Sequence, residues 1–464
     1  MIFPPLARLL RGCPRRAVII GTAGVLAIAF VLGLLDVRRR ALNSDFTVFV
    51  IAGAAFFDGR DPYAVANPQG WHYAYSPLFA LVVSPLARLD FRDQVMIWYA
   101  ISVGLGALCV AESCWLLALI QRDRPSAAAA GVPRWIVVTA LLSVIFPALD
   151  SLQRGQLGLL ITWLLLLGLR CSLAAPNWMA AGLGGLVLAL PVSIKLTPLL
   201  PVALLALVSL RAPREGNVGE GLASPLTLGA GVVLGLALFV FVLPAALLGW
   251  NRNLAHLETW VGRVQASAKV GVDDNKYTFR NQSFANAVEM LARWEHPRSP
   301  LRWTSPRDPA IRDLRAEPRT PRALLNAVVW GGQLILLVLA ILAGWRLADG
   351  GAALGLAAAF GVGSALSLVI SPVSWGHHYP VLLPAALFVP WWLACRGHDT
   401  AARWMSTALP SIVIVHYVLI DTAWVEQPVG RAFVWAVGLL GVGTAVWCAA
   451  ATALVLATPR EHGG

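Results

Sequence analysis

The chain has 464 residues, of which 58% are hydrophobic and only 13% are charged, and its mean hydropathy is +0.69. Soluble proteins carry about 25% charged residues, so this composition excludes an ordinary soluble domain. The apolar runs have the length of membrane-spanning helices rather than of the short alternating strands of a barrel. The net charge of +12 comes mostly from Arg. In a membrane protein such cations set topology and contact anionic lipid, so no nucleic-acid partner is expected.

The cysteines and the N-terminus give little indication of chemistry. The six cysteines lie in or beside apolar runs or in the N-terminal tail, without metal-ligand spacing, so we expect neither a structural disulfide nor a metal site. Four arginines precede the first apolar run, as in a signal peptide. No A-x-A-like cleavage site follows, and Asp36 and Arg38–Arg40 come next. We therefore expect a retained first helix over residues 17–35.

The apolar runs predict an all-α polytopic membrane protein with about twelve transmembrane helices. The predicted spans cover residues 17–35, 94–121, 135–149, 156–170, 178–192, 196–210, 224–249, 323–345, 350–370, 379–395, 404–421 and 431–457. Several are short, and two pairs are separated by very few residues, so the count is open by one or two. We expect one integral membrane domain over residues 1–464.

Two long segments between spans are expected outside the cytoplasm. With the N-terminal arginines inside, every inner connection carries at least one Arg, as the positive-inside rule requires, although Arg38–Arg40 then lie outside. The first segment, residues 36–93, contains two apolar stretches too short to span, which predict re-entrant or interfacial helices. The second, residues 250–322, is basic and rich in Trp. Prolines crowd its second half and predict irregular structure there.

Polar clusters from distant parts of the sequence fall on the same predicted outer face. They are Asp45, Asp58–Tyr63, Tyr73–Pro77, Asp150 with Gln153–Gln156, Lys195, Asn275–Asn286 and Ser374–Tyr379. A transporter would instead place ionisable residues near the bilayer midplane. Only Glu112 clearly lies within a predicted span, where it either has such a role or makes a satisfied contact between helices. The distribution favours chemistry at the outer face.

Three of these outer residues have side chains suited to acid–base or phosphate chemistry. Asp45 follows the first span, where a partly desolvated carboxylate can act as a general base, but it also precedes an apolar run and would serve as a helix N-cap. Lys195 lies between two closely spaced spans and suits either a lipid phosphate or a snorkelling anchor. Arg280 is a second phosphate candidate, because a guanidinium can hold two phosphate oxygens.

His377 and His378 form the most distinctive polar pair. Either ring can hydrogen-bond a phosphate or a sugar, and since adjacent side chains point apart on a helix, at most one is expected to face a site. The alternative is a pair of interfacial histidines at a helix start. Several aromatic residues would stack on a sugar or form an interfacial belt: Tyr63, Trp71, Tyr73, Tyr75, Trp375 and Tyr379. The sequence has no P-loop, G-x-S-x-G or H-E-x-x-H motif, which argues against nucleotide and serine hydrolysis.

Six sequence blocks carry a family resemblance. They are S-D-F-x-V-F-x-x-A-G-A-A-F-F-D-G-R-D-P-Y, Y-A-Y-S-P-L-F-A-L, R-G-Q-L-G-L-L, S-I-K-L-T-P, F-R-N-Q-S-F and S-P-V-S-W-G-H-H. In this order they resemble glycosyltransferase family eighty-seven, a group of polytopic GT-C enzymes. The family includes bacterial polyprenyl-phosphate-mannose-dependent α-mannosyltransferases of phosphatidylinositol mannoside and lipoglycan assembly. The blocks run from about residue 44 to 385 and cover most of the chain.

The resemblance implies inverting transfer of a sugar, with mannose the first expectation, from a polyprenyl-phosphate donor to a hydroxyl of a lipid-linked or cell-envelope glycan, without a cofactor. It assigns Asp45 as the base. It also implies that Lys195, Arg280 and one of His377 or His378 hold the phosphate, whose developing negative charge cationic donors stabilise. Further substrate-binding candidates are Tyr75, Gln156, Asn281, Gln282 and Trp375, and secondary acid candidates are Asp150 and Glu258.

The expected location is the bacterial inner membrane, with the active site facing the periplasm and membrane lipids as partners. Two other functions stay open. A flippase or transporter for lipid-linked sugars would depend on Glu112 rather than Asp45. A structural subunit of an envelope-assembly complex would tolerate single polar substitutions.

Overall fold

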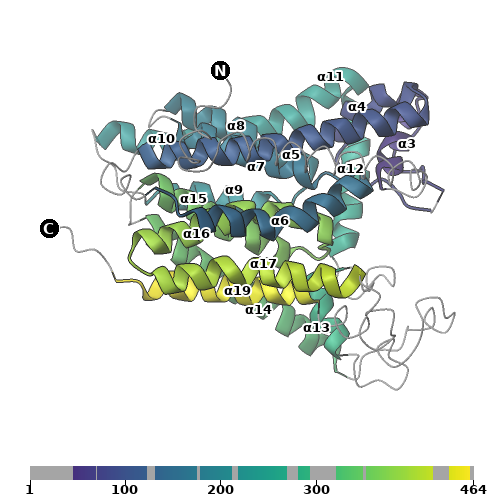
Figure 1. The fold of residues 1–464 in the computed structure, drawn as a ribbon. Coiled ribbons are helices and arrows are strands. Elements are labelled where there is room, and N and C mark those ends of the chain that lie inside the picture. Colours follow the sequence, from purple (N-terminus) through teal and green to yellow (C-terminus); the bar gives the residue numbers. More distant parts are fainter. Residues whose placement is uncertain are drawn as a thin grey trace, which may run out of the picture. The chain divides into compact units, whose positions relative to one another are not determined.

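The computed structural model describes nine stretches of the chain (Figure 1), namely residues 45–68, 70–122, 131–174, 178–211, 218–268, 281–292, 320–348, 352–421 and 438–459. The predicted first span at 17–35, Arg280 and most of the Pro-rich part of the second long segment lie outside these residues. In the described part the regular structure is helical, apart from one isolated bridge between Ala66 and His72. This confirms the predicted all-α class.

Seven of the described helical stretches are long and apolar enough to cross a membrane. They are α5 (Phe91–Arg122), α6 (Arg134–Arg154), Pro225–Leu248, α14 (Arg322–Ala348), α15 (Ala352–Ile370), Gly376–Cys395 and α19 (Leu439–Ala457). The protein is therefore a multi-pass membrane protein. Three predicted spans form shorter apolar helices: α7 (Gly158–Leu173), α8 (Trp178–Ile194) and α9 (Leu199–Ser209). The predicted span at 404–421 lies within α17 (Asp399–Asp421), and the total number of spans stays a prediction.

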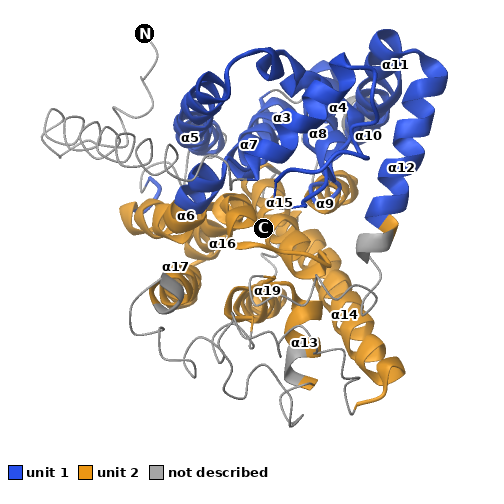
Figure 2. Ribbon diagram, turned by 90° about the vertical axis from the view of Figure 1, so that its right-hand side faces the viewer, with its two compact units in different colours: residues 1–133, 148–198, 215–264 blue, residues 134–147, 199–214, 265–464 orange. Residues whose placement is uncertain are grey.

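The chain divides into two compact units (Figure 2). Unit 1 comprises residues 1–133, 148–198 and 215–264, and unit 2 comprises residues 134–147, 199–214 and 265–464. In unit 1, α5 packs against α7, α7 against α8, and α8 against α10 (Val218–Leu236). Glycines allow α8 and α10 to approach each other closely, because a Cβ atom at Gly185 of α8 or Gly231 of α10 would overlap the backbone of the other helix.

In unit 2, α15 is the central helix. It packs against α9, α14, α16 (Leu383–Cys395) and α19, and it is buried along almost its whole length. Two of its glycines make this possible: Gly361 lies against the backbone of Ala385, and Gly363 lies against Pro201. Helix α17 covers α16 and α19. The short helix η5 (Gly376–Leu382) precedes α16 and carries both adjacent histidines.

The two short apolar stretches of the first long segment form helices, as predicted. They are α3 (Phe46–Phe57) and α4 (Pro77–Val83), the latter continued by the 3-10 helix η2 (Ser84–Arg88). Helix α3 packs against η2 at Gly53, where an added Cβ would come within 2.9 Å of the Ser84 Cα. Most of the α3 surface is buried within unit 1. The connection between α3 and α4 is anchored by Asn67, whose side-chain amide donates to the Thr47 hydroxyl at 3.0 Å.

The first part of the second long segment is also a helix, α12 (Trp250–Ala268). Its buried side chains recur at helical spacing: Asn253, His256, Leu257 and Trp260. Figures 1 and 2 show α12 running across the direction of α5 and α10 in its own unit. Asn253 anchors it to the preceding span by donating to the carbonyl of Val240, at 3.1 Å, in the π-helical segment η3 (Ala237–Val242).

Candidate active site

Asp45 occupies the N-cap position of α3, but its side chain makes no capping hydrogen bond. Its carboxylate instead lies 3.9 Å from the Arg154 guanidinium, and the side chain is 20% exposed. Arg154 also bonds Asp150 one helical turn earlier, at 2.7 Å. Two carboxylates therefore share one guanidinium at the end of α6. The Asp45 side chain therefore does not cap α3, contrary to the alternative that its position suggested.

The Arg-Gly-Gln sequence forms the turn that ends α6. Gly155 has a φ of 64°, a left-handed conformation that suits glycine. The Gln156 N–H donates to the Ser151 carbonyl at 2.8 Å, and the Trp98 indole donates to the Gly155 carbonyl at 2.8 Å. A Cβ atom at Gly155 would lie 2.7 Å from the Cβ of Phe46. The turn thus packs directly against the first residue of α3, beside the candidate base.

Tyr75 lies between two of the other predicted site residues. Its hydroxyl donates to Gln156 Oε1 at 3.2 Å, and the Lys195 ammonium nitrogen lies 5.9 Å from its ring centroid. The ring also contacts Phe49 edge to face at 5.2 Å. Burial, and then the charge of Asp45, raise the pKa of Tyr75, so its hydroxyl stays protonated.

Lys195 directly follows α8, and its backbone N–H continues the helical pattern by donating to the Pro191 carbonyl at 3.0 Å. Burial lowers the pKa of Lys195 to about 7, and the nearby Asp45 carboxylate opposes part of this shift. The side chain therefore lies close to its titration midpoint at neutral pH. An anion bound beside it would favour the charged ammonium.

Unit 1 thus brings together four predicted site residues, Asp45, Tyr75, Gln156 and Lys195. Arg154 was not predicted as a site residue, although it lies within the polar cluster around Asp150. The available signal was its spacing of four residues from Asp150, which places opposite charges on one helix face.

Unit 2 holds the histidine pair in a 3-10 turn. The Trp375 N–H donates to His378 Nδ1 at 3.2 Å, so the proton of a neutral His378 ring resides on Nε2. His377 is buried, and its ring lies edge to face with that of His378, with 4.6 Å between centroids. The two rings are therefore in contact, although adjacent side chains in a helix were expected to point apart.

Asn281 and Gln282 are fully buried and bonded to the protein. The Asn281 side-chain oxygen accepts the Ser374 N–H at 2.9 Å, and the Gln282 N–H donates to the Ser374 carbonyl at 2.5 Å. The Gln282 side-chain oxygen accepts the Leu440 N–H at the start of α19, at 3.2 Å. These two residues brace the segment that leads to Trp375. Arg280 lies outside the described residues.

The remaining candidates differ in their surroundings. Glu258 is exposed on α12. Glu112 of α5 accepts two hydrogen bonds from Arg170 of α7, at 2.5 and 3.3 Å, and is therefore a satisfied contact between helices. Among the aromatic candidates, Tyr63, Tyr73 and Tyr379 are fully buried, whereas Trp71 is 41% exposed. Trp375 is half-buried and stacks on His377 with 6.2 Å between ring centroids.

Comparisons with known proteins show the family of this chain. The family model described as Glycosyltransferase family 87 matches residues 73–372, well over half of the chain. The chain is also 25% identical over 413 residues to the polyprenol-phosphate-mannose-dependent alpha-(1-2)-phosphatidylinositol mannoside mannosyltransferase of Mycobacterium tuberculosis, covering 84% of this chain and 82% of the relative. No solved structure matches the chain. The chain therefore belongs to glycosyltransferase family 87 and is a membrane-embedded glycosyltransferase.

Proposed function

We propose that the protein transfers mannose from a polyprenyl-phosphate donor to a hydroxyl group of a membrane glycolipid. The name of the similar mycobacterial protein, which specifies this donor and a phosphatidylinositol mannoside acceptor, supports the substrate class. The observation that carries the proposal is the grouping of a carboxylate, Asp45, with the half-buried Lys195 around Tyr75. Such a pair supplies a base for the acceptor and a cation for the phosphate.

In the proposed reaction, Asp45 takes the proton of the acceptor hydroxyl. The hydroxyl oxygen then attacks the anomeric carbon from the side opposite the phosphate. The new carbon–oxygen bond forms as the bond to the phosphate oxygen breaks, and the phosphate leaves with that electron pair. A single displacement inverts the anomeric centre, so a β-linked donor yields an α-linked product. The phosphate leaves as an anion, and cationic donors stabilise the charge that develops on it.

The proposed donor-phosphate ligands are Lys195, Arg280 and the histidine pair. Within that pair, His378 is half-buried and carries its proton on Nε2, so it can donate to a phosphate oxygen, while buried His377 supports its ring. Tyr75, Gln156 and Trp375 are the proposed contacts to the sugar or the acceptor. Asn281 and Gln282 act as positioning residues, because their side chains bond the protein itself.

The proposed location is the bacterial inner membrane, with the site facing the periplasm. The distribution of arginines and the proposed substrates support this placement. Arginines accumulate on the connections assigned to the cytoplasm. The proposed donor and acceptor are also both lipids, which the surrounding bilayer can deliver.

The deciding experiment is mannose transfer by purified protein carrying Asp45→Asn. Polyprenyl-phosphate mannose and a glycolipid acceptor mixture are supplied, and the anomeric configuration of the product is read by NMR. The matched control is Asp58→Asn, because Asp58 is an exposed carboxylate in the same loop that pairs with nearby Arg60. We expect Asp45→Asn to lose at least about 100-fold in kcat, the usual contribution of a general base, with its melting temperature unchanged. Asp58→Asn should retain the wild-type rate.

A folded Asp45→Asn variant that transfers at the wild-type rate would rule out Asp45 as the base and direct attention to Asp150 and Glu258. A wild-type protein that moves the lipid-linked sugar across a bilayer without transferring it would overturn the enzymatic proposal in favour of a flippase.

A further inference from the structure

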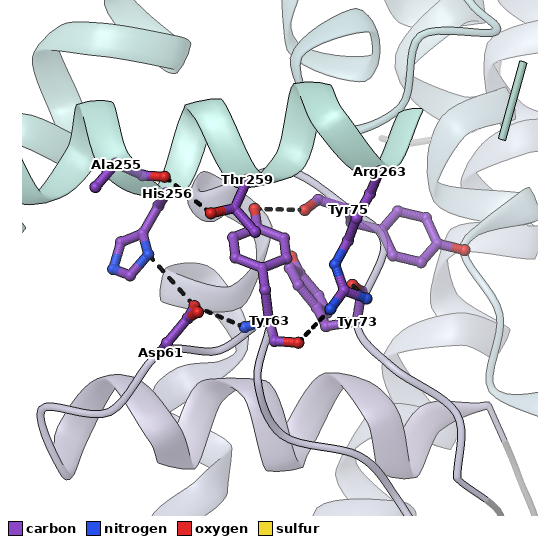
Figure 3. Close-up of polar contacts among 8 residues, drawn as sticks. All are labelled: Asp61, Tyr63, Tyr73, Tyr75, Ala255, His256, Thr259 and Arg263. Carbon is purple, nitrogen blue, oxygen red and sulfur yellow. Dashed lines mark hydrogen bonds and ion pairs between the residues drawn. The ribbon is translucent and has the colours of Figure 1, made fainter. Parts of the chain in front are cut away.

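Helix α12 holds the loop between α3 and α4 through one arginine. The Arg263 guanidinium donates to the backbone carbonyl of Tyr63 and, at 3.4 Å, to that of Tyr73 (Figure 3). It also lies 5.7 Å from the Tyr63 ring centroid. A planar guanidinium is suited to two acceptors at once, which a lysine ammonium cannot bind in the same geometry. One side chain therefore fixes two loop positions that are ten residues apart.

The side chains of the same two tyrosines bind the backbone at Tyr75 and Ser76. The Tyr63 hydroxyl donates to the Tyr75 carbonyl at 2.9 Å, and the Tyr73 hydroxyl donates to the Ser76 carbonyl at 2.7 Å. Both tyrosine rings are fully buried. Burial is also the main cause that raises the pKa of Tyr63, so its hydroxyl remains a donor. An unbroken series of contacts thus runs from Arg263 to the backbone of Tyr75.

A second contact fixes α12 along the same loop. His256 lies seven residues before Arg263, about two helical turns away. Its Nδ1 lies 3.6 Å from the Asp61 carboxylate, and the same carboxylate oxygen accepts the Tyr63 N–H at 2.9 Å (Figure 3). The His256 ring also packs edge to face against Phe56 of α3, with 5.3 Å between centroids. Two anchor points prevent α12 from pivoting over the loop, so Arg263 is held at a defined place.

We infer that Arg263 is a positioning residue for sugar transfer, acting through Tyr63 and Tyr73 to set the place of Tyr75 beside Lys195. The inference rests on the proposed function of the site around Asp45. Without Arg263, the two loop carbonyls lose their shared donor, and the Tyr75 backbone is free to shift relative to Lys195. A displacement of about 1 Å at a reacting site can lower the rate by about 100-fold.

A double-mutant cycle tests this relation. The variants are Arg263→Gln, Tyr75→Ala and their combination, assayed for mannose transfer. We expect Arg263→Gln alone to lower kcat/KM by about 10- to 100-fold. In the Tyr75→Ala background, the same change should cost less than about threefold, because the residue through which Arg263 acts is already gone. Arg263→Lys, which keeps the charge but not the two-pronged geometry, should recover only part of the loss.

The matched control is Arg92→Gln, which removes an exposed arginine from α5 in the same unit. It should leave kcat/KM unchanged, which excludes a general effect of net charge. Melting temperatures of all variants are measured in parallel. Equal losses from Arg263→Gln in both backgrounds would mean that Arg263 acts on stability or elsewhere, and would overturn the inference.

A chemical readout works without catalysis. The chain contains only three lysines, Lys195, Lys269 and Lys276, so peptide mass spectrometry can follow acetylation of each amine. We expect Arg263→Gln to raise the labelling rate of Lys195 severalfold, relative to the other two, because Tyr75 no longer keeps its place beside it. An unchanged Lys195 rate would contradict the inference. If wild-type protein transfers no sugar, the proposed function fails, and this labelling still reports whether Arg263 controls the surroundings of Lys195.

Discussion

The charges of Asp45 and Lys195 act on the same tyrosine and on each other. Burial lowers the pKa of Lys195 to about 7, and the Asp45 carboxylate limits the shift. In the proposed role, a donor phosphate bound beside this amine would favour its charged form. A lysine suits this role because its pKa responds strongly to burial, whereas an arginine stays charged at any physiological pH.

This pKa predicts the alkaline limb of the pH–rate profile. If the charged amine binds the donor phosphate, kcat/KM should fall about tenfold per pH unit above the free-enzyme pKa of about 7. Lys195→Arg keeps a positive charge throughout this range, so its profile should stay flat from about pH 7 to 9, even if its maximum is lower. Steady-state rates at saturating acceptor and limiting donor measure both profiles. An equally steep fall in both enzymes would assign the limb to another group.

Residues of the candidate site could be singled out from the sequence where their type was unusual for their position, such as a lysine among apolar spans. Arg154 and Arg263 were not predicted because arginine is common in this chain. In a membrane protein, loop arginines are ordinarily explained by their role in setting the topology. What distinguishes these two arginines is their partners. Arg154 contacts a carboxylate more than one hundred residues away, and Arg263 contacts carbonyls 190 and 200 residues away. No local pattern encodes such pairs.

At the scale of elements, the three residues of the turn after α6 contact both the candidate base and Tyr75. Arg154 contacts the candidate base, Gln156 accepts from Tyr75, and Gly155 lets the chain reverse between them. The predicted span ended at residue 149, because the apolar pattern stops there. The helix in fact continues to Arg154, supported by the ion pair with Asp150 one turn earlier.

Gly155→Ala should therefore damage both stability and transfer. A left-handed conformation costs a non-glycine residue about 1 kcal/mol, and the new methyl group would also overlap Phe46, adding about 1–3 kcal/mol of overpacking. Gly59→Ala is the matched control, because Gly59 also has a positive φ, of 69°, but an added Cβ meets nothing within 4 Å. Thermal unfolding and kcat/KM are compared for both variants. Equal effects would show that the contact with Phe46 is unimportant.

The elements were predicted best where apolar length alone decides the structure. The long spans α5, α14 and α15 lie close to the predicted ranges, and the two short stretches before Arg88 form α3, α4 and η2. By contrast, no helix was predicted for α12, because its composition is mixed and polar. The helical spacing of its buried residues can be recognised only when the loop that they pack against is known.

At the scale of the whole molecule, the proposed topology places the loop after α3 outside the cytoplasm and the end of α5 inside. Single cysteines at exposed Arg60 and exposed Arg122, in a background without the six native cysteines, test this directly. A membrane-impermeant maleimide added to intact cells should label the cysteine at position 60. The cysteine at position 122 should be labelled only after the membrane is broken. The reverse pattern would place the Asp45 site on the cytoplasmic face.

The two units also differ in when their parts become available during synthesis. The segment around Asn281 and Gln282 receives a hydrogen bond from Leu440, which is 158 residues further along the chain. Gly441 meets the same segment so closely that an added Cβ would overlap the Gln282 backbone. A chain that enters the membrane from its N-terminus must therefore wait for α19 before this support is complete. Helix α19 carries none of the proposed site residues, yet it completes the support of the segment around Asn281 and Gln282. Truncating α19 would therefore remove a structural contact of the part of the chain that holds His377 and His378.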